Sequence, residues 1–120
     1  MIEVINIEDK FSIIGDYWSP KIAGELNGQH IKLAKIKGEF TMHKHDREDE
    51  MFLVISGQLT MVLEHKTLIL NPGEFVIIPK GTLHKPIAIE ETQILLFEPM
   101  STINTGDQIN QLTQTDLERI

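Results

Sequence analysis

Residues 42–52 read MHKHDREDEMF, with two histidines one residue apart and five consecutive charged residues after the second. On a β-strand, residues i and i+2 point to the same side, so His43 and His45 would project together and could bind one ion. The DRED stretch is too polar for a buried strand. We expect it to form a loop or bulge that resets the strand parity and brings Glu50 beside the histidines. Taken alone, the stretch is also compatible with an ordinary exposed charged loop.

A second stretch, residues 71–84, reads NPGEFVIIPKGTLH and ends in a third histidine, His84. This residue follows a predicted turn and is available as a fourth ligand. A single histidine near the start of a strand is often only a surface or hydrogen-bonded residue, so His84 gains weight from its partners. His30 and His65 have no partner at metal-ligand spacing, and we expect them to lie outside any metal site.

The middle of the chain reads as short strands separated by turns. Asn27-Gly28 is a strong β-hairpin signal between two apolar segments, and Asn71-Pro72-Gly73 is a turn whose residues have the required backbone preferences. The predicted strands cover residues 21–26, 29–37, 51–56, 58–64, 67–70, 74–79, 83–89 and 92–99. Strands at such regular spacing predict an all-β sandwich or barrel.

Two spaced motifs join these observations. The first is Gly38-x4-His43-x-His45-x4-Glu50-x6-Gly57, and the second is Gly73-x5-Pro79-x-Gly81-x2-His84. In this order, on a background of strands, they resemble the two signature motifs of the cupin superfamily, which are small jelly-roll barrels, also called double-stranded β-helices. The first motif has one residue fewer than usual between its glycine and first histidine, and Ala88 stands where the second usually ends in asparagine.

The resemblance implies the metal ligands His43, His45, Glu50 and His84, all of which are present. The wider similarity is to the small mono-cupins of the mannose-6-phosphate isomerase-like group. Three imidazoles and one carboxylate suit one divalent transition-metal ion per chain, with Fe, Mn, Ni, Co and Zn as the candidates. This ligand set does not suit Ca²⁺ or Mg²⁺, which prefer all-oxygen ligands.

Three readings of function are open. The first is a metal-dependent enzyme of oxygenase or isomerase type that acts on a small molecule. The second is a non-enzymatic small-ligand-binding module with a structural or vestigial metal. The third is a protein without metal whose histidines lie on the surface. No catalytic base is evident beside the predicted ligands, so no catalytic residue is assigned, and no organic cofactor is expected.

Composition restricts the partners. At 120 residues with a formal net charge of −7, the chain is expected to be one domain, residues 1–120, with a barrel core at about 21–98 and a polar tail at 101–120. The negative charge argues against nucleic acid or an anionic membrane as the main partner. The chain has no cysteine, and its acidic first residues do not resemble a signal peptide, so a cytoplasmic location is expected.

Parity in residues 50–56 predicts a covered sheet. Both faces of this strand are apolar, with Phe52 and Val54 on one and Met51, Leu53 and Ile55 on the other. In a sheet with one face in water, apolar and polar residues should instead alternate along the strand. A second covering layer is therefore expected, and a homodimer is a plausible source of it.

Three further expectations concern packing. The apolar wall of the cavity around the expected metal ion is expected to include Phe52, Val54, Phe75, Ile77 and Phe97. Trp18 is expected to be a packing anchor. The last residues are expected either to form one helical turn capped by Thr115 or to fray.

Overall fold

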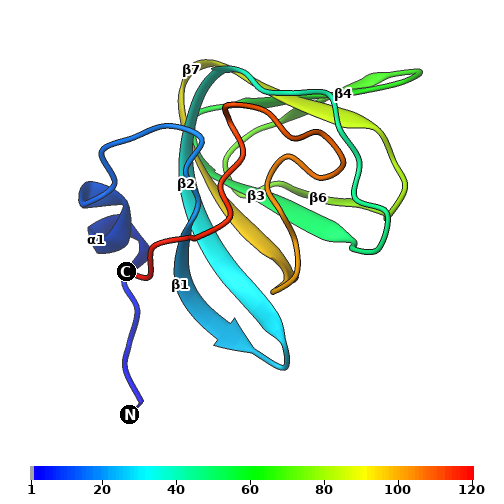
Figure 1. Ribbon diagram of the computed structural model, residues 1–120. Helices are drawn as coiled ribbons and strands as arrows, with labels where there is room; N and C mark the ends of the chain where they lie inside the picture. Colours follow the sequence, from blue (N-terminus) through cyan, green and yellow to red (C-terminus); the bar gives the residue numbers. More distant parts are fainter. Residues whose placement is uncertain (1) are drawn as a thin grey trace.

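The computed structural model describes residues 2–120 and consists mainly of β-strands (Figure 1). One short helix precedes the strands. The elements are α1 (Ile7–Ser12), β1 (Lys21–Leu26), β2 (Gln29–Glu39), β3 (Glu50–Ser56), β4 (Leu59–Leu63), β5 (Thr67–Leu70), β6 (Phe75–Ile78) and β7 (His84–Pro99). The hairpin predicted at Asn27-Gly28 is confirmed, because β1 and β2 pair antiparallel around these two residues, both with positive φ.

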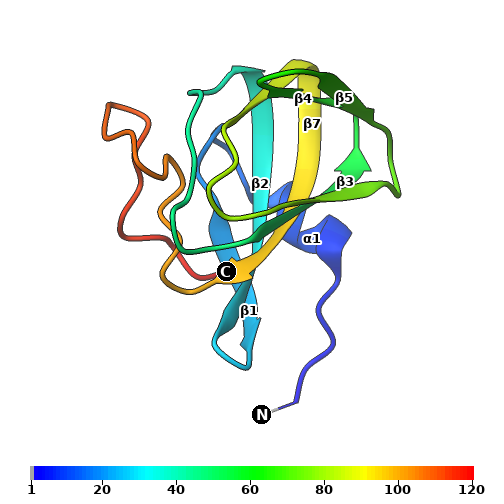
Figure 2. The same cartoon turned by 90° about the vertical axis from the view of Figure 1, so that its right-hand side faces the viewer.

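The strands form an antiparallel sheet in the order β1-β2-β7-β3-β6, with β4 paired to β5 and to β7. The two segments predicted at residues 83–89 and 92–99 are one continuous 16-residue strand, β7, which pairs with β2, β3 and β4. The sheet rolls up on itself (Figure 2), so the predicted all-β jelly roll is confirmed. Its hydrogen-bonded path is open between β1 and β6 within residues 2–120, so the sheet is not a closed barrel.

Alternating residues of the strands fill the interior. Val54 and Met61 are fully buried, and Phe52 is 4% exposed, in one cluster with apolar residues of β2, β4, β6 and β7. The prediction of the cavity wall was wrong for part of its residues. Phe75 and Ile77 are 58% and 57% exposed, and Phe97 is half-buried, because β6 and the end of β7 turn the opposite parity inward.

The outer face of the sheet is partly covered by α1. Asn6 caps this helix by accepting a hydrogen bond from the Asp9 N–H at 2.9 Å. Phe11 and Ile14, 1% and 3% exposed, pack with Leu33 of β2 in a second apolar cluster. Part of the covering layer predicted from strand parity is therefore the chain's own N-terminal segment. No helix among residues 2–120 has the length and apolar character needed to cross a membrane.

The C-terminal tail, residues 100–120, leaves the end of β7 and returns to the side of the sheet that carries α1, where the C-terminus lies (Figure 1) and Ile120 packs against the cluster of Phe11 and Leu33. Neither expectation for its end was right. No helix forms after Thr115, and the last residues do not fray, because they align with β1. The Ile120 N–H donates to the Ile22 carbonyl at 3.0 Å, and the Ile22 N–H donates to the Glu118 backbone carbonyl at 2.9 Å.

Candidate metal centre

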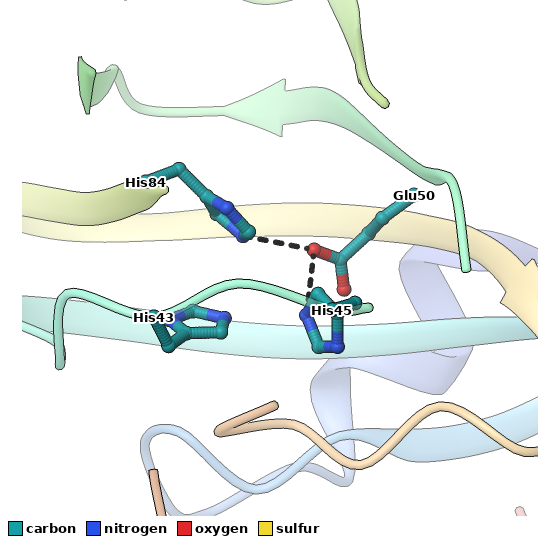
Figure 3. A group of neighbouring side chains, drawn as sticks. All are labelled: His43, His45, Glu50 and His84. Carbon is teal, nitrogen blue, oxygen red and sulfur yellow. Dashed lines mark hydrogen bonds and ion pairs between the residues drawn. The ribbon is translucent and has the colours of Figure 1, made fainter. Parts of the chain in front are cut away.

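Three separate segments bring the predicted ligands together (Figure 3). His43 and His45 lie in the connection between β2 and β3, Glu50 is the first residue of β3, and His84 is the first residue of β7. Two backbone hydrogen bonds join His43 to His84, with N–O distances of 3.0 and 2.9 Å. The DRED loop therefore does what the sequence predicted, because Glu50 faces inward beside the histidines.

The four side chains present one compact set of donor atoms inside the protein. One ligand atom from each residue lies within 4.8 Å of all the others. The Oε1 atom of Glu50 is 3.2 Å from Nε2 of His84 and 3.3 Å from Nε2 of His45. All four residues are at most 4% exposed, so the expectation, within the third reading, that these histidines lie on the surface is wrong.

Backbone carbonyls orient two of the imidazole rings. In its neutral form, His43 donates its Nδ1–H to the Thr41 carbonyl at 2.7 Å, and His84 donates its Nδ1–H to the Thr82 carbonyl at 2.9 Å. This tautomer leaves the lone pair of Nε2 pointing into the cluster, which is the usual arrangement for metal-ligating histidine.

The donor set fits a cation. With the Nδ1–H of His84 donated to the Thr82 carbonyl, a neutral ring would present its Nε2 lone pair to a carboxylate oxygen of Glu50 3.2 Å away, where two hydrogen-bond acceptors would meet. The buried Nε2 of His45 has no hydrogen-bond partner among the described residues, although the same oxygen is 3.3 Å away. A metal ion between these atoms would satisfy both arrangements, because each nitrogen and the carboxylate would then act as a ligand.

The charge states of the cluster favour metal binding at neutral pH. Burial, together with the nearby His84, lowers the pKa of His43 to about 4, so this ring is neutral and ready to ligate. Burial alone would raise the pKa of Glu50, but interactions with Glu98, His45 and His84 outweigh it and hold the pKa well below its ordinary value. His43 and Glu50 are thus already in the ionisation state that a metal ligand requires before an ion binds.

A second buried carboxyl, Glu98 of β7, lies next to the cluster and was missed from the sequence. Its pKa is raised well above the ordinary value by burial and by the charge of Glu50. Its Oε1 atom accepts a hydrogen bond from Lys32 at 2.7 Å, and both side chains are 2% exposed. The alternation of β7 was the available signal, because Ile94, Leu96 and Glu98 share the inward face.

A small apolar cavity of about 40 Å³ adjoins the cluster. Trp18, Phe40 and Phe52 line it together with His43, Glu50 and Glu98. The predicted packing role of Trp18 is confirmed, because its ring stacks on Phe40 with the centroids 4.7 Å apart. A cavity of this size accommodates a few water molecules or a diatomic gas.

The tail closes one side of the site. Gly106 packs so closely that a Cβ atom there would collide with the Lys44 carbonyl and meet the His43 ring at 3.0 Å. The Asp107 N–H donates to the Lys44 carbonyl at 3.0 Å, and the Asp107 carboxylate accepts from the Lys44 N–H at 3.1 Å. A solvent-filled hollow lined by His45 and Asp107 lies beside this contact.

The other two histidines lie apart from the cluster, as predicted. His30 is buried in β2 with neither ring nitrogen hydrogen-bonded among the described residues, and His65 is exposed in the turn between β4 and β5. Neither is in the group of four residues that could hold a metal ion.

The family model for the cupin domain matches residues 30–98, which is more than half of the chain and contains all four clustered residues. The chain belongs to this cupin family. The resemblance predicted from the two motifs is therefore confirmed over the strands that carry the site.

Two curated relatives and one solved structure illustrate the similarity. The chain is 35% identical over 75 residues to the uncharacterized protein YdbB of Bacillus subtilis, covering 62% of this chain and 66% of that one. It is 32% identical over 77 residues to quercetin 2,3-dioxygenase of the same organism, covering 60% of this chain but only 23% of the relative. The chain thus spans less than two thirds of either relative.

A cupin-2 domain containing protein from Shewanella frigidimarina has a crystal structure that superposes with a TM-score of 0.79 at 44% identity, covering 80% of this chain and 94% of that one. This structure shares both fold and sequence with the present chain over most of its length.

Proposed function

We propose that His43, His45, Glu50 and His84 bind one divalent transition-metal ion, and that the chain is a metal-dependent enzyme of oxygenase type. Iron, manganese, nickel, cobalt and zinc are the candidate ions. The observation that supports the proposal best is the buried meeting of two imidazole Nε2 atoms, of His45 and His84, with one carboxylate oxygen of Glu50, at distances of 3.3 and 3.2 Å. Such an arrangement is unfavourable without a cation and favourable with one.

The surrounding residues would serve such a reaction. The carbonyls of Thr41 and Thr82 hold two rings in the ligating orientation. Four protein ligands leave up to two positions free on a six-coordinate ion, and a redox-active metal there would supply Lewis acidity and dioxygen activation. The apolar wall formed by Trp18, Phe40 and Phe52 would exclude bulk water from these positions.

The relatives support the class of chemistry but name no substrate for this chain. One curated relative bears the name quercetin 2,3-dioxygenase, and the present chain spans 23% of it. We therefore extend only the use of dioxygen to this protein, and the metal dependence that we propose rests on the buried cluster itself. A sugar-isomerase type of reaction is less well supported, because the cavity of about 40 Å³ contains no lysine or arginine for a phosphosugar.

The test combines metal content with turnover. The untagged protein is purified without added metal, reconstituted separately with each candidate ion, and assayed for oxygen uptake with small phenols and enols. We expect uptake with one redox-active ion, lost in His84→Ala and retained in the control His65→Ala, whose ring is exposed and lies outside the cluster. Metal bound at one ion per chain without turnover on the whole panel would refute the enzymatic part.

A non-enzymatic binding module is the alternative, and the small, tail-covered cavity favours it. In that case a small molecule that binds beside the metal raises the melting temperature, with a shift that grows with the logarithm of its concentration above Kd, and no product forms. Thermal melts of the metal-loaded protein with the same panel, followed by product analysis, separate the two functions.

We also propose that the protein forms a homodimer. Phe75 and Ile77 of the edge strand β6 are more than half exposed, and their register partners Leu53 and Met51 extend the apolar surface across β3. An exposed apolar edge strand is a ready surface for a second copy. We expect sedimentation to give twice 13.7 kDa, and Ile77→Lys to give 13.7 kDa. A single 13.7 kDa species for the unmodified chain would refute the dimer.

A further inference from the structure

A second cleft, separate from the metal cavity, lies between the C-terminal tail and the inner face of β2. Its volume is about 330 Å³, several times that of the metal cavity. His30 and Lys32 of β2 form one wall, and Thr102, Gln114 and Thr115 of the tail form the other. Lys32 lines this cleft while its partner Glu98 lines the metal cavity, so the Lys32–Glu98 ion pair separates the two spaces.

Two buried side chains in this cleft have polar atoms without partners. His30 is 6% exposed, and neither Nδ1 nor Nε2 has a hydrogen-bond partner within residues 2–120. Thr102 is also 6% exposed, and its Oγ1 has none. A buried polar group left unpaired costs about 1–3 kcal/mol, so native proteins rarely leave three such atoms at one place unless water or a ligand satisfies them.

The charged groups of the cleft are already balanced. Lys32 is paired with Glu98 at 2.7 Å, and Arg119 is paired with Glu25 at 2.6 Å. Asp116 adds a negative charge to the lining. An anionic ligand would have to compete with these pairs, and the chain as a whole carries −7. The unsatisfied atoms therefore call for hydrogen bonds rather than for a counter-charge.

The hydrogen-bonding pattern identifies the chemistry of the ligand. Burial and the nearby Lys32 lower the pKa of His30, so its ring is neutral and offers one N–H donor and one nitrogen acceptor. The Thr102 hydroxyl is likewise both donor and acceptor. Hydroxyl groups are complementary to both, because each can donate and accept at the same oxygen.

From this geometry we infer that the cleft between the tail and β2 is a binding site for an uncharged, hydroxyl-rich small molecule of the polyol or sugar class. The volume of about 330 Å³ falls within the range of small-molecule pockets. The inference does not depend on the metal proposal, because none of the four clustered residues lines this cleft.

The experiment is an NMR titration of the full-length protein labelled in its backbone and in its histidine rings. The uncharged probes are glycerol, xylitol and D-glucose, and the matched anionic probes are D-glucuronate and glucose 6-phosphate. An uncharged probe should shift the His30 ring signals and the amides of residues 100–103 and 114–119 saturably. The anionic probes should bind more weakly.

Two variants locate the site. His30→Phe keeps the ring but removes both nitrogens, and Thr102→Val removes only the hydroxyl. Thr102→Val should weaken binding about tenfold, as expected for one lost hydrogen bond to a buried group, and His30→Phe, which removes two hydrogen-bonding atoms, should weaken it at least as much. His65→Phe and Thr67→Val, at exposed positions, are the controls and should leave binding unchanged. His84→Ala should also leave it unchanged, so failure of the metal proposal would not imitate failure here.

Three results would overturn the inference. The first is no saturable shift with any uncharged probe, which would mean that water alone satisfies the buried atoms. The second is preferential binding of the anionic probes. The third is unchanged affinity in both cleft variants. If His30→Phe fails to fold, the nearly isosteric Thr102→Val decides the outcome.

Discussion

The buried ion pair between Lys32 and Glu98 gives a quantitative prediction. The distance from Nζ to Oε1 is 2.7 Å, and both side chains are 2% exposed, so solvent screens the pair very little. Lys32→Met keeps most of the aliphatic stem but leaves the Glu98 carboxyl buried without its counter-charge. Removing one partner of such a pair typically costs 3–5 kcal/mol, so we expect up to about that loss in the free energy of unfolding at a pH where Glu98 is ionised.

Urea unfolding of the metal-free protein measures this cost, and its pH dependence tests the cause. Burial and the charge of Glu50 raise the pKa of Glu98 above its ordinary value, and loss of Lys32 removes the group that opposes this shift. A proton can then neutralise the uncompensated carboxyl. The native variant binds this proton more readily than the unfolded chain, so the cost of Lys32→Met should shrink as the pH is lowered from about 8 toward 5.

The control is Lys85→Met. Lys85 pairs with Glu39 at 2.8 Å, but the two side chains are 29% and 64% exposed, so its loss should cost less than about 1 kcal/mol. A cost for Lys32→Met no larger than this control, or one that grows as the pH falls, would refute the reasoning. The double variant Lys32→Met with Glu98→Leu should recover much of the lost stability, because no unpaired charge remains buried.

Three other changes test separate parts of the structure. Folding lowers the pKa of His43 from 6.5 to about 4, so between these pH values the unfolded metal-free chain binds more protons than the folded chain. The free energy of unfolding should therefore decline as the pH falls from 6.5 to about 4. The same pH dependence in urea unfolding of His43→Phe would contradict this. Gly106→Ala adds a Cβ atom at φ +57° against the Lys44 carbonyl, so the free energy of unfolding should fall by about 1–3 kcal/mol. An unchanged midpoint in urea would argue against close packing of the tail. Phe11, 1% exposed, anchors α1, so Phe11→Ala should cost about 3–5 kcal/mol without changing metal affinity, and an affinity change would couple the helix to the site.

The site was largely predictable because its ligands follow strand and turn geometry. The i, i+2 spacing predicted that His43 and His45 project together, although the structure places them in the connection between β2 and β3 and not on a strand, and the DRED loop explains how Glu50 joins them. The prediction of His84 as a ligand depends on its place at the end of the second motif. The reaction and the native metal do not follow from these four residues, because the same donor set suits several ions and many cupin chemistries.

Other features depended on tertiary contacts that the sequence pattern does not encode. The parities of Phe75 and Ile77 were misassigned, because each turn and bulge along the chain can reverse which residues face inward. Glu98 was overlooked as an acid at a strand end, although its place in the alternation of β7 predicted burial. The tail was polar and without periodicity, so its alignment with β1 and its packing over His43 had no local signal.

Metal content of the purified protein is the most direct test of the central claim. The untagged chain is prepared without added metal and analysed for all transition elements, beside His84→Ala and the exposed-histidine control His65→Ala. The buried set of His43, His45, Glu50 and His84 predicts about one transition-metal ion per chain in the unmodified protein and in the control, and a large loss in His84→Ala. The account would be contradicted if the unmodified protein held no metal and bound none on reconstitution, or if His84→Ala retained the full content.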